Sequence, residues 1–235
     1  MNSCLMKKNS IAGLRRGMPV SLGAAKSGAP VTPARADAGG EDARAHSDYG
    51  IVVIGASLGG TRALSCLLSA LPGQFPLPLA IVLHRGVDGD ATLKQLLHRH
   101  STLPVLEAED KMPLTGGHAY LAPANYHLLV GKAEFSLSTE APVAFARPSI
   151  DVLFESASAA YGAKTLAVLL TGASADGAWG AAKIRERGGT VVVQDPETAE
   201  CPIMPRAAIA ADAASSILPL EAIPGILADL SQRKH

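Results

Sequence analysis

The sequence has no net charge, few aromatic side chains and no long apolar run, and each of these shortages excludes a class of protein. Its 21 basic and 21 acidic residues cancel, so no overall field favours a nucleic acid or a strongly cationic partner. No apolar run approaches the roughly 20 residues that a membrane-spanning helix needs. Near the start of the chain, charged residues interrupt the apolar ones too early for a secretory signal.

Cysteine is also scarce. Cys4, Cys66 and Cys201 are odd in number, widely spaced and free of any C-x-x-C pair. This pattern indicates neither a disulfide framework nor a zinc site. A reducing cytoplasm is therefore the expected compartment.

What the sequence does contain is typical of a packed α/β core. Hydrophobic residues make up 48% of the chain and charged residues 18%, and the abundant alanine and glycine suit helices that pack closely on a sheet. A length of 235 residues allows one sizeable domain with an appendage, or two small domains.

The appendage is predicted at the N-terminus. Residues 1–48 are rich in Ala, Gly, Pro and Ser and show no periodic apolar face, so this segment is expected to be a disordered tail. Its early basic residues would suit an acidic surface, but a solvated tail or a misassigned start site explains them as well. Residues 49–235 are expected to form the folded domain.

Within that domain, strand-like and helix-like patterns alternate. "IVVIG", "PLAIVLH", "LPVLEAE", "KTLAVLLTG" and "TVVVQD" are the strand-like runs, and helical stretches separate most of them. This alternation predicts a mostly parallel sheet. Residues 118–138 alternate more like an antiparallel hairpin, with its turn near Gly131. Asp90 and Ser149 are predicted to cap the helices that follow them.

The stretch "GIVVIGASLGG" at residues 50–60 ends a strand-like run with small residues and one serine. Gly55, Ser57 and Gly59 match G-x-S-x-G, a pattern in which a sharp turn presents a nucleophilic serine. Two other interpretations remain open at this point. A dinucleotide loop would need a second glycine where Ser57 stands, and a tight turn without chemistry would also suit the small residues.

Polar residues after three of the predicted strands suggest a catalytic triad. Ser57, His84 and Asp176 each follow an apolar run, and the carboxyl ends of parallel strands meet at one edge of a sheet. A serine needs a neighbouring imidazole as base and an acid to orient that base. Asp176 also fits the N-cap of the helix that follows it. Two other histidines, His118 and His127, flank the predicted hairpin.

Longer blocks of the sequence show a family resemblance. "VIGASLGG", "LEAEDKMPLTGGHAYLAPANYHLLV", "RPSIDVLF", "LLTGASADGAWG" and "VVVQDPETAECPIMPRAAI" occur in this order. Together they resemble the catalytic domain of the CheB-type protein-glutamate methylesterases of chemotaxis. The resemblance covers roughly residues 50–230 and is far more specific than one G-x-S-x-G motif.

The resemblance implies a doubly wound, three-layer α/β/α domain that works without a metal or organic cofactor. It also implies an enzyme that hydrolyses glutamyl methyl esters, and deamidates certain glutamines, on methyl-accepting chemotaxis receptors. Such a partner would bring the enzyme into peripheral contact with membrane-bound receptors. By motif match, the family's catalytic serine, histidine and aspartate fall on Ser57, His84 and Asp176.

Substrate and oxyanion contacts are expected from three further residues. The backbone amides of Leu58 and Ala173 would bind the oxyanion of the tetrahedral intermediate. Arg147, in "RPSIDVLF", would bind carboxylates of the substrate, although a surface arginine ahead of the Ser149 cap is an equally good explanation.

The sequence departs from the family pattern at several positions. Leu83 and Arg85 flank His84 where relatives usually have glutamine and methionine, and Ala173 replaces a methionine near the expected oxyanion site. The 48 residues before the domain are fewer than the roughly 100 of a typical domain, so the resemblance implies a catalytic domain without the usual receiver domain. An enzyme of non-chemotaxis signalling and a non-catalytic interaction domain are the alternatives.

Overall fold

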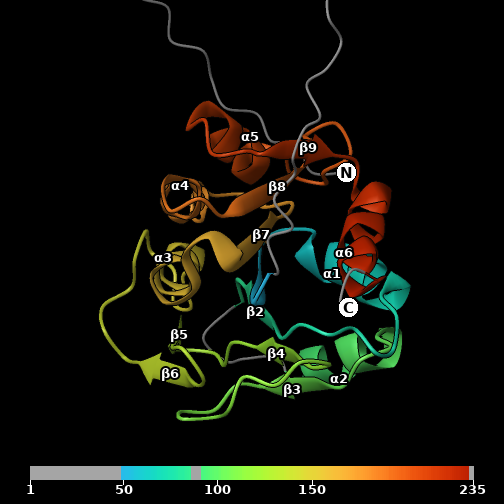
Figure 1. Ribbon diagram of the computed structural model, residues 1–235. Coiled ribbons are helices and arrows are strands. Elements are labelled where there is room, and N and C mark those ends of the chain that lie inside the picture. The colour runs from blue at the N-terminus through green and yellow to red at the C-terminus, as the bar shows by residue number, and fades with distance from the viewer. Residues whose placement is uncertain (1–48, 86–90, 233–235) are drawn as a thin grey trace, which may run out of the picture. The chain divides into compact units, whose positions relative to one another are not determined.

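The computed structural model describes residues 49–85 and 91–232 (Figure 1). The predicted tail over residues 1–48 and the predicted cap at Asp90 lie outside the described residues. None of the described helices is both long and apolar enough to cross a membrane.

The described residues form one large sheet in which every strand pair is parallel. Its seven strands run in the order β3-β4-β2-β1-β7-β8-β9. Their bounds are β1 (Ile51–Ala56), β2 (Leu79–Leu83), β3 (Val105–Glu107), β4 (Ala119–Leu121), β7 (Thr165–Leu169), β8 (Thr190–Gln194) and β9 (Ser216–Leu218).

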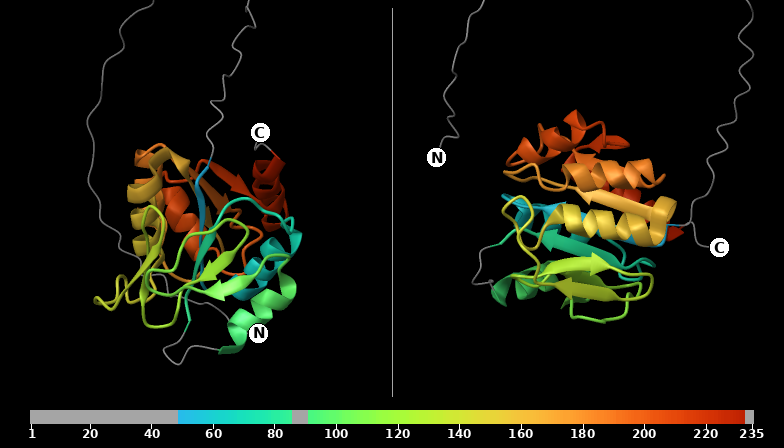
Figure 2. Two further views of the ribbon diagram at one scale, coloured as in Figure 1. Left: turned by 60° about the horizontal axis from the view of Figure 1, so that its bottom comes forward. Right: turned by 90° about the vertical axis from the view of Figure 1, so that its left-hand side faces the viewer.

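Helices cover both faces of this sheet, as the resemblance predicted (Figures 1 and 2). One face carries α1 (Gly60–Ala70), α2 (Ala91–His100) and α6 (Ile223–Gln232), and the other carries α3 (Ile150–Tyr161), α4 (Ala178–Glu186) and α5 (Ile203–Ala210). Short 3-10 turns occupy Gly162–Lys164 and Leu220–Ala222. The prediction of a doubly wound, three-layer α/β/α domain is therefore confirmed.

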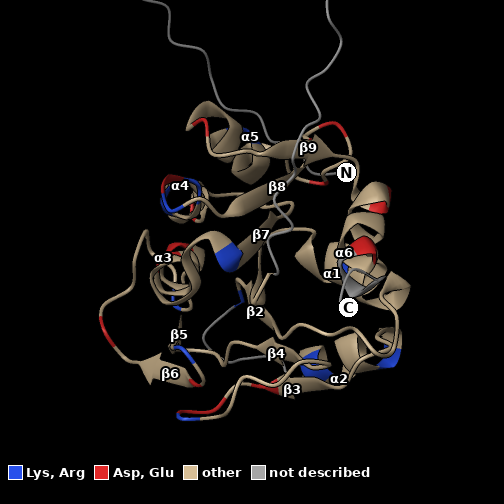
Figure 3. Cartoon of the chain, viewed as in Figure 1, with Lys and Arg blue, Asp and Glu red and all other residues tan. Residues whose placement is uncertain are grey.

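The central strands are apolar because both of their faces are buried. In β1, Val52 and Ile54 pack into the layer of α1, α2 and α6, whereas Ile51 and Val53 pack into the layer of α3, α4 and α5. No charged residue occurs in β1, β2, β7 or β8, whose ribbons carry no blue or red in Figure 3. Charge is confined to helices, loops and the outer strand β3.

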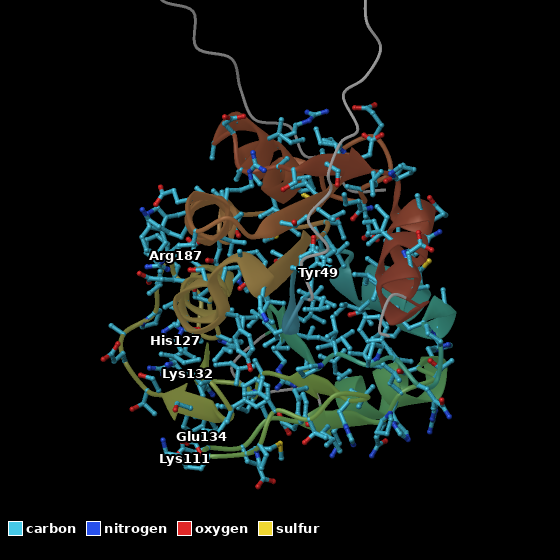
Figure 4. All side chains as sticks on the ribbon, viewed as in Figure 1. Tyr49, Lys111, His127, Lys132, Glu134 and Arg187 are labelled. Carbon is cyan, nitrogen blue, oxygen red and sulfur yellow. The ribbon has the colours of Figure 1, made fainter. Side chains whose placement is uncertain are left out.

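The antiparallel hairpin is present but shorter than predicted. It consists of β5 (His127–Val130) and β6 (Phe135–Ser138), and the Gly131 amide donates to the Glu134 carbonyl across its turn at 2.8 Å. Lys111 reaches Glu134 beside this turn, with 3.4 Å between Nζ and Oε1 (Figure 4).

The prediction was wrong for the first part of this region. Residues 119–121 form β4, which pairs in parallel between β3 and β2. All three side chains are buried, and so short an apolar run does not by itself distinguish a parallel strand from one arm of a hairpin. His118 therefore precedes a strand of the main sheet, and His127 is the first residue of the hairpin.

His127 has a structural role in the segment that leads to α3. Its ring is buried, its Nε2 lies 3.1 Å from the Ala141 carbonyl, and its Nδ1 accepts the Ser149 amide at 3.3 Å. The ring therefore holds residues 141–149 against the hairpin.

Strand order places a topological switch point between β1 and β7 at the carboxyl edge of the sheet. The chain leaves β1 on one side through β2 and returns on the other side through β7. β1 and β7 are neighbours, but the connection after β1 leads to β2 on one side of the sheet and the connection after β7 leads to β8 on the other side. In doubly wound sheets, ligands bind in the crevice that forms at such a point.

Candidate active site

Ser57 lies in the short turn between β1 and α1, at this crevice. The Ser57 amide donates to the Thr171 carbonyl at 2.9 Å, and the Gly60 amide donates to the Ser57 carbonyl at 2.8 Å. The turn is possible because Gly59 has a φ of 80°, a left-handed conformation that glycine adopts without strain. The turn therefore leads directly into α1 and is bound to the chain that follows β7.

Glycines allow the close packing around this serine. A Cβ atom on Gly60 would lie 2.7 Å from the Ala56 Cβ and 2.5 Å from Leu83 Cδ1. A Cβ atom on Gly172 would lie 2.9 Å from the Ser57 Cβ. The small residues that surround Ser57 in the sequence thus bring α1 and the β7 loop into direct contact with the serine turn.

His84 follows β2, the neighbour of β1. Its amide donates to the Ala56 carbonyl at 3.0 Å, which places His84 beside Ser57 at the edge of the sheet. Its Nε2 lies 2.7 Å from Asp176 Oδ2. Since Nε2 is occupied by the carboxylate, Nδ1 is the ring nitrogen that remains for a serine proton. Among the described residues, no hydrogen bond yet joins this ring to Ser57 Oγ.

Asp176 is buried and accepts four hydrogen bonds. Oδ2 accepts from His84 and, at 2.7 Å, from the Ile150 amide. Oδ1 accepts from the Ser149 hydroxyl at 2.9 Å and from the Asp151 amide at 3.0 Å. The carboxylate therefore orients the imidazole and at the same time caps the N-terminus of α3.

This arrangement corrects two predicted caps. Asp176 does not cap its own helix, because the N-cap residue of α4 is Gly177. Ser149 stands at the N-cap position of α3, but its hydroxyl makes no capping bond there and donates to Asp176 instead. The two helices begin side by side. The first amides of α3 donate to Asp176, which precedes α4, and the Gly177 amide at the start of α4 donates to Asp151 of α3.

Asp151 completes an exchange between the two helices. It belongs to α3, and its Oδ1 accepts the amides of Gly177 at 2.8 Å and Gly180 at 2.7 Å, at the start of α4. A carboxylate at a helix N-terminus satisfies free amides and interacts favourably with the helix dipole. Asp151 therefore caps α4, while Asp176 caps α3.

The two carboxyl groups have opposite pKa shifts. Burial would raise the pKa of Asp176, but the hydrogen bonds from His84, the Asp151 and Ile150 amides and the Ser149 hydroxyl outweigh it and lower that pKa. Burial is the main cause that raises the pKa of Asp151 to about 6, and the nearby Asp176 charge adds to it, against the Gly180 and Gly177 amides. Below about pH 6, Asp176 is thus the ionised member of the pair.

The Thr171 hydroxyl holds the backbone of Leu58, whose amide is one of the expected oxyanion donors. This buried hydroxyl accepts the Cys201 amide at 2.8 Å and lies 2.9 Å from the Leu58 carbonyl. Among the described residues, none accepts a hydrogen bond from the Leu58 amide. This amide therefore stays available next to Ser57, while the Leu58 side chain points into solvent.

Ala173, the second expected donor, follows Gly172, whose backbone is also held by hydrogen bonds. The Gly172 amide donates to the Cys201 carbonyl, and the Met204 amide donates to the Gly172 carbonyl, each at 3.0 Å. No described residue accepts a hydrogen bond from the Ala173 amide. The Leu58 and Ala173 amides therefore both lack a described acceptor, and they lie in the loops that follow β1 and β7.

Sequence reasoning missed the roles of Thr171, Asp151 and Gln194. Gln194 is the last residue of β8 and is buried; its Oε1 accepts the Thr171 amide at 2.9 Å. A polar residue at the end of an apolar strand was the available signal for Thr171. For Asp151 there was none, because its partners lie 26 residues or more along the chain.

Arg147 shares a pocket with His84. It lines a pocket of about 370 Å³ together with His84, Arg85, Asn125 and Phe145. Its Nη1 donates to the Thr139 and Glu140 carbonyls. The side chain is half-buried rather than a fully exposed surface arginine. Within residues 49–85 and 91–232, no group of three or more His, Cys, Asp or Glu side chains could hold a metal ion.

Comparison with known proteins gives one consistent result. The family model described as CheB methylesterase matches residues 52–227. A protein of Leptospira interrogans, provisionally named protein-glutamate methylesterase/protein-glutamine glutaminase, is 46% identical over 79% of this chain and 96% of its own length. A protein of Anaeromyxobacter dehalogenans named protein-glutamate methylesterase/protein-glutamine glutaminase 2 is 42% identical over 77% of this chain and 53% of its own length.

The fold comparison agrees. The crystal structure of the Thermotoga maritima CheB methylesterase catalytic domain superimposes with a TM-score of 0.75 and 37% identity, covering 77% of this chain and 98% of that domain. The chain therefore belongs to the CheB methylesterase family.

Proposed function

We propose that this member of the CheB methylesterase family hydrolyses γ-methyl esters of glutamate side chains in methyl-accepting chemotaxis receptors. The observation that carries the proposal is the 2.7 Å hydrogen bond between His84 Nε2 and Asp176 Oδ2, beside Ser57 at the crevice between β1 and β7. Relatives named protein-glutamate methylesterase share the fold and the sequence. A receptor substrate also implies work at the cytoplasmic side of a membrane.

In the first half of the reaction, Ser57 Oγ attacks the ester carbonyl while His84 Nδ1 takes the hydroxyl proton. The oxygen–carbon bond forms and the carbonyl oxygen becomes an oxyanion. His84 then gives its proton to the methoxy oxygen, and methanol leaves an acyl-serine. Asp176 stays ionised and stabilises the imidazolium, in keeping with its lowered pKa.

The second half repeats these proton transfers with water. His84 takes a proton from water, the hydroxide attacks the acyl-serine, and Ser57 leaves with the proton that His84 returns. The product is a free glutamate side chain. The Leu58 and Ala173 amides bind the oxyanion in both halves, and each such donor is typically worth about 3 kcal/mol.

The same groups are suited to deamidation of glutamine side chains. In that reaction ammonia replaces methanol as the leaving group, and His84 protonates the departing nitrogen in place of the methoxy oxygen. The acyl-serine and its hydrolysis are unchanged. We assign Arg147 to the binding of substrate carboxylates, because its guanidinium lines the pocket next to His84.

The test is release of radiolabelled methanol from receptor membranes that carry labelled methyl esters. We expect the natural chain to release methanol and Ser57→Ala to release none above the uncatalysed background. Ser69→Ala is the matched control, because Ser69 is an exposed residue near the end of α1 whose hydroxyl donates to the Cys66 carbonyl. Equal release by the natural chain and Ser57→Ala would contradict the proposal.

A further inference from the structure

The pocket beside His84 includes the proposed base but not the nucleophile. Its described lining is His84, Arg85, Asn125, Pro142, Phe145, Ala146, Arg147 and Pro148. Ser57, Leu58 and Ala173 are not part of it. The pocket is therefore suited to a part of the substrate other than the scissile ester.

Arg85 forms one wall and is held in place by two hydrogen bonds from one nitrogen. Its Nη2 donates to Glu107 Oε1 at 2.8 Å and to the Ala122 carbonyl at 2.7 Å. The side chain is only 9% exposed, yet its Nε has no hydrogen-bond partner among the described residues. A buried donor without a partner is rare in native proteins and needs a physical explanation.

Arg147 is the second arginine of the lining and shows the same feature. Its Nη1 donates to two backbone carbonyls, at Thr139 and Glu140, and its buried Nε also has no partner among the residues that the structure describes. Within the part of the chain that the structure describes, no carboxylate lies within ion-pair distance of Arg147. Its positive charge is therefore not neutralised by any of the described residues.

The pocket as a whole is suited to an anion. Its described lining residues include two arginines and a histidine but no acidic residue, and Glu107 pairs with Arg85. Pro142 and Phe145 supply apolar surface next to the charges. A short aliphatic stem that ends in a carboxylate would match both parts, because guanidinium N–H groups form strong charge-assisted bonds with carboxylates.

We propose that this pocket binds the carboxylate of an aspartate or glutamate that neighbours the methylated glutamate in the protein substrate. The inference rests on the proposed function and adds a preference for acidic sequence around the ester. Arg85 and Arg147 are its specificity-determining residues. A glutamine at the same substrate position has no charge, so it would desolvate the Arg147 guanidinium without neutralising it.

The first experiment compares two synthetic peptides with a central glutamate γ-methyl ester. One has glutamates on both sides of the ester, and the other has glutamines at those positions. For the natural full chain we expect kcat/KM to be about tenfold higher for the acidic peptide, the size of effect that one charge-assisted hydrogen bond produces. Equal values for the two peptides would overturn the proposal.

Variants then assign the preference to the pocket. In Arg85→Met and in Arg147→Met the ratio of the two kcat/KM values should fall towards one, and this ratio does not depend on how much of the variant is folded. Arg185→Met is the control, because Arg185 is exposed near the end of α4 and should leave the ratio unchanged. A full preference in both pocket variants would contradict the assignment.

A binding experiment separates this inference from the proposed function. The full chain with Ser57→Ala is titrated into fluorescein-labelled versions of the same two ester peptides, and anisotropy gives the Kd for each. We expect about tenfold tighter binding of the acidic peptide, lost when Arg85→Met is added. Absence of hydrolysis with this preference intact would refute only the esterase function. Equal Kd values would refute only the subsite.

Discussion

Asp176 and Asp151 cap each other's helices. Asp176 precedes α4 and accepts the first amides of α3, whereas Asp151 lies in α3 and accepts the first amides of α4. The proposed orienting acid is thereby part of the packing between two helices. Its position depends on that packing, and the packing depends on its charge.

Asp176→Asn should therefore lower both activity and stability. The variant keeps the shape of the side chain but loses the charge that stabilises the imidazolium. The equivalent Asp→Asn substitution in a serine protease lowers kcat about 10⁴-fold. It also places an amide nitrogen where several donors converge, which should cost about 1–3 kcal/mol in free energy of unfolding. Methanol release and urea denaturation measure the two effects. A loss of less than tenfold in kcat would contradict the assigned role.

The raised pKa of Asp151 predicts a pH-dependent stability. Its pKa rises from 3.8 to about 6 on folding, so between these values the native state binds more protons than the unfolded state. The contribution of this group to stability is complete below pH 3.8 and is lost as the pH rises through 6. The loss corresponds to about 3 kcal/mol at 1.36 kcal/mol per pKa unit.

Asp151→Asn tests this directly, because asparagine keeps an oxygen acceptor for the Gly177 and Gly180 amides and does not ionise. The free energy of unfolding of the variant minus that of the natural chain should rise by about 3 kcal/mol between pH 3.5 and 7. Asp176 has the opposite sign, since its lowered pKa stabilises the native state at higher pH, and it is present in both proteins. A difference that stays constant with pH would refute the raised pKa.

Thr171→Val should reduce kcat more than it affects KM. The substitution keeps the volume but removes the hydroxyl that links Cys201 to the Leu58 carbonyl, so the Leu58 amide loses its fixed orientation. An interaction made mainly in the transition state appears in kcat, and Thr171→Ser should restore much of it. Thr165→Val is the matched control, because Thr165 begins β7 at the end away from Thr171. Its buried hydroxyl donates at 3.2 Å to the Ala157 carbonyl of α3. Equal activity losses in the two valine variants would argue against an oxyanion role for Leu58.

Gly172→Ala should damage activity more than stability. The new Cβ would lie 2.5 Å from the end of the Met204 side chain, which can move, and 2.9 Å from the Ser57 Cβ, which is held by the turn. Displacement of the nucleophile by a fraction of an ångström is enough to slow a reaction that depends on alignment. Gly73→Ala is the control, because its Cβ would have a nearest neighbour at 3.7 Å. Unchanged kcat in Gly172→Ala would contradict this prediction, because it would mean that the new Cβ does not disturb the alignment of Ser57.

Ser57→Ala, His84→Ala and the double variant test whether these residues act as one unit. Each single variant should abolish measurable methanol release above the oxyanion-assisted background, and the double variant should be hardly worse than either. Losses that multiply in the double variant would show independent roles. Circular dichroism of all three proteins checks that the fold is intact.

The sequence by itself determined the layer architecture. Short apolar runs rich in β-branched residues, such as Ile51–Ile54, are typical of strands buried on both faces, and their alternation with amphipathic helices favours a parallel sheet. The same reasoning placed Ser57, His84 and Asp176 at strand ends, because it needs only local pattern and the rule that parallel carboxyl ends share an edge. It failed where local pattern is ambiguous, at the three-residue strand β4.

Only the tertiary structure decided which atoms meet. That Asp176 caps α3 and not α4, that Asp151 returns the cap, and that the Thr171 hydroxyl lies against Leu58 all depend on contacts between residues 25 to 113 positions apart. Local propensity carries no information about such pairs. The same holds for the pocket between Arg85 and Arg147, since the direction of a long charged side chain is set by the partners that the fold brings to it, here Glu107 and the carbonyls of residues 122, 139 and 140.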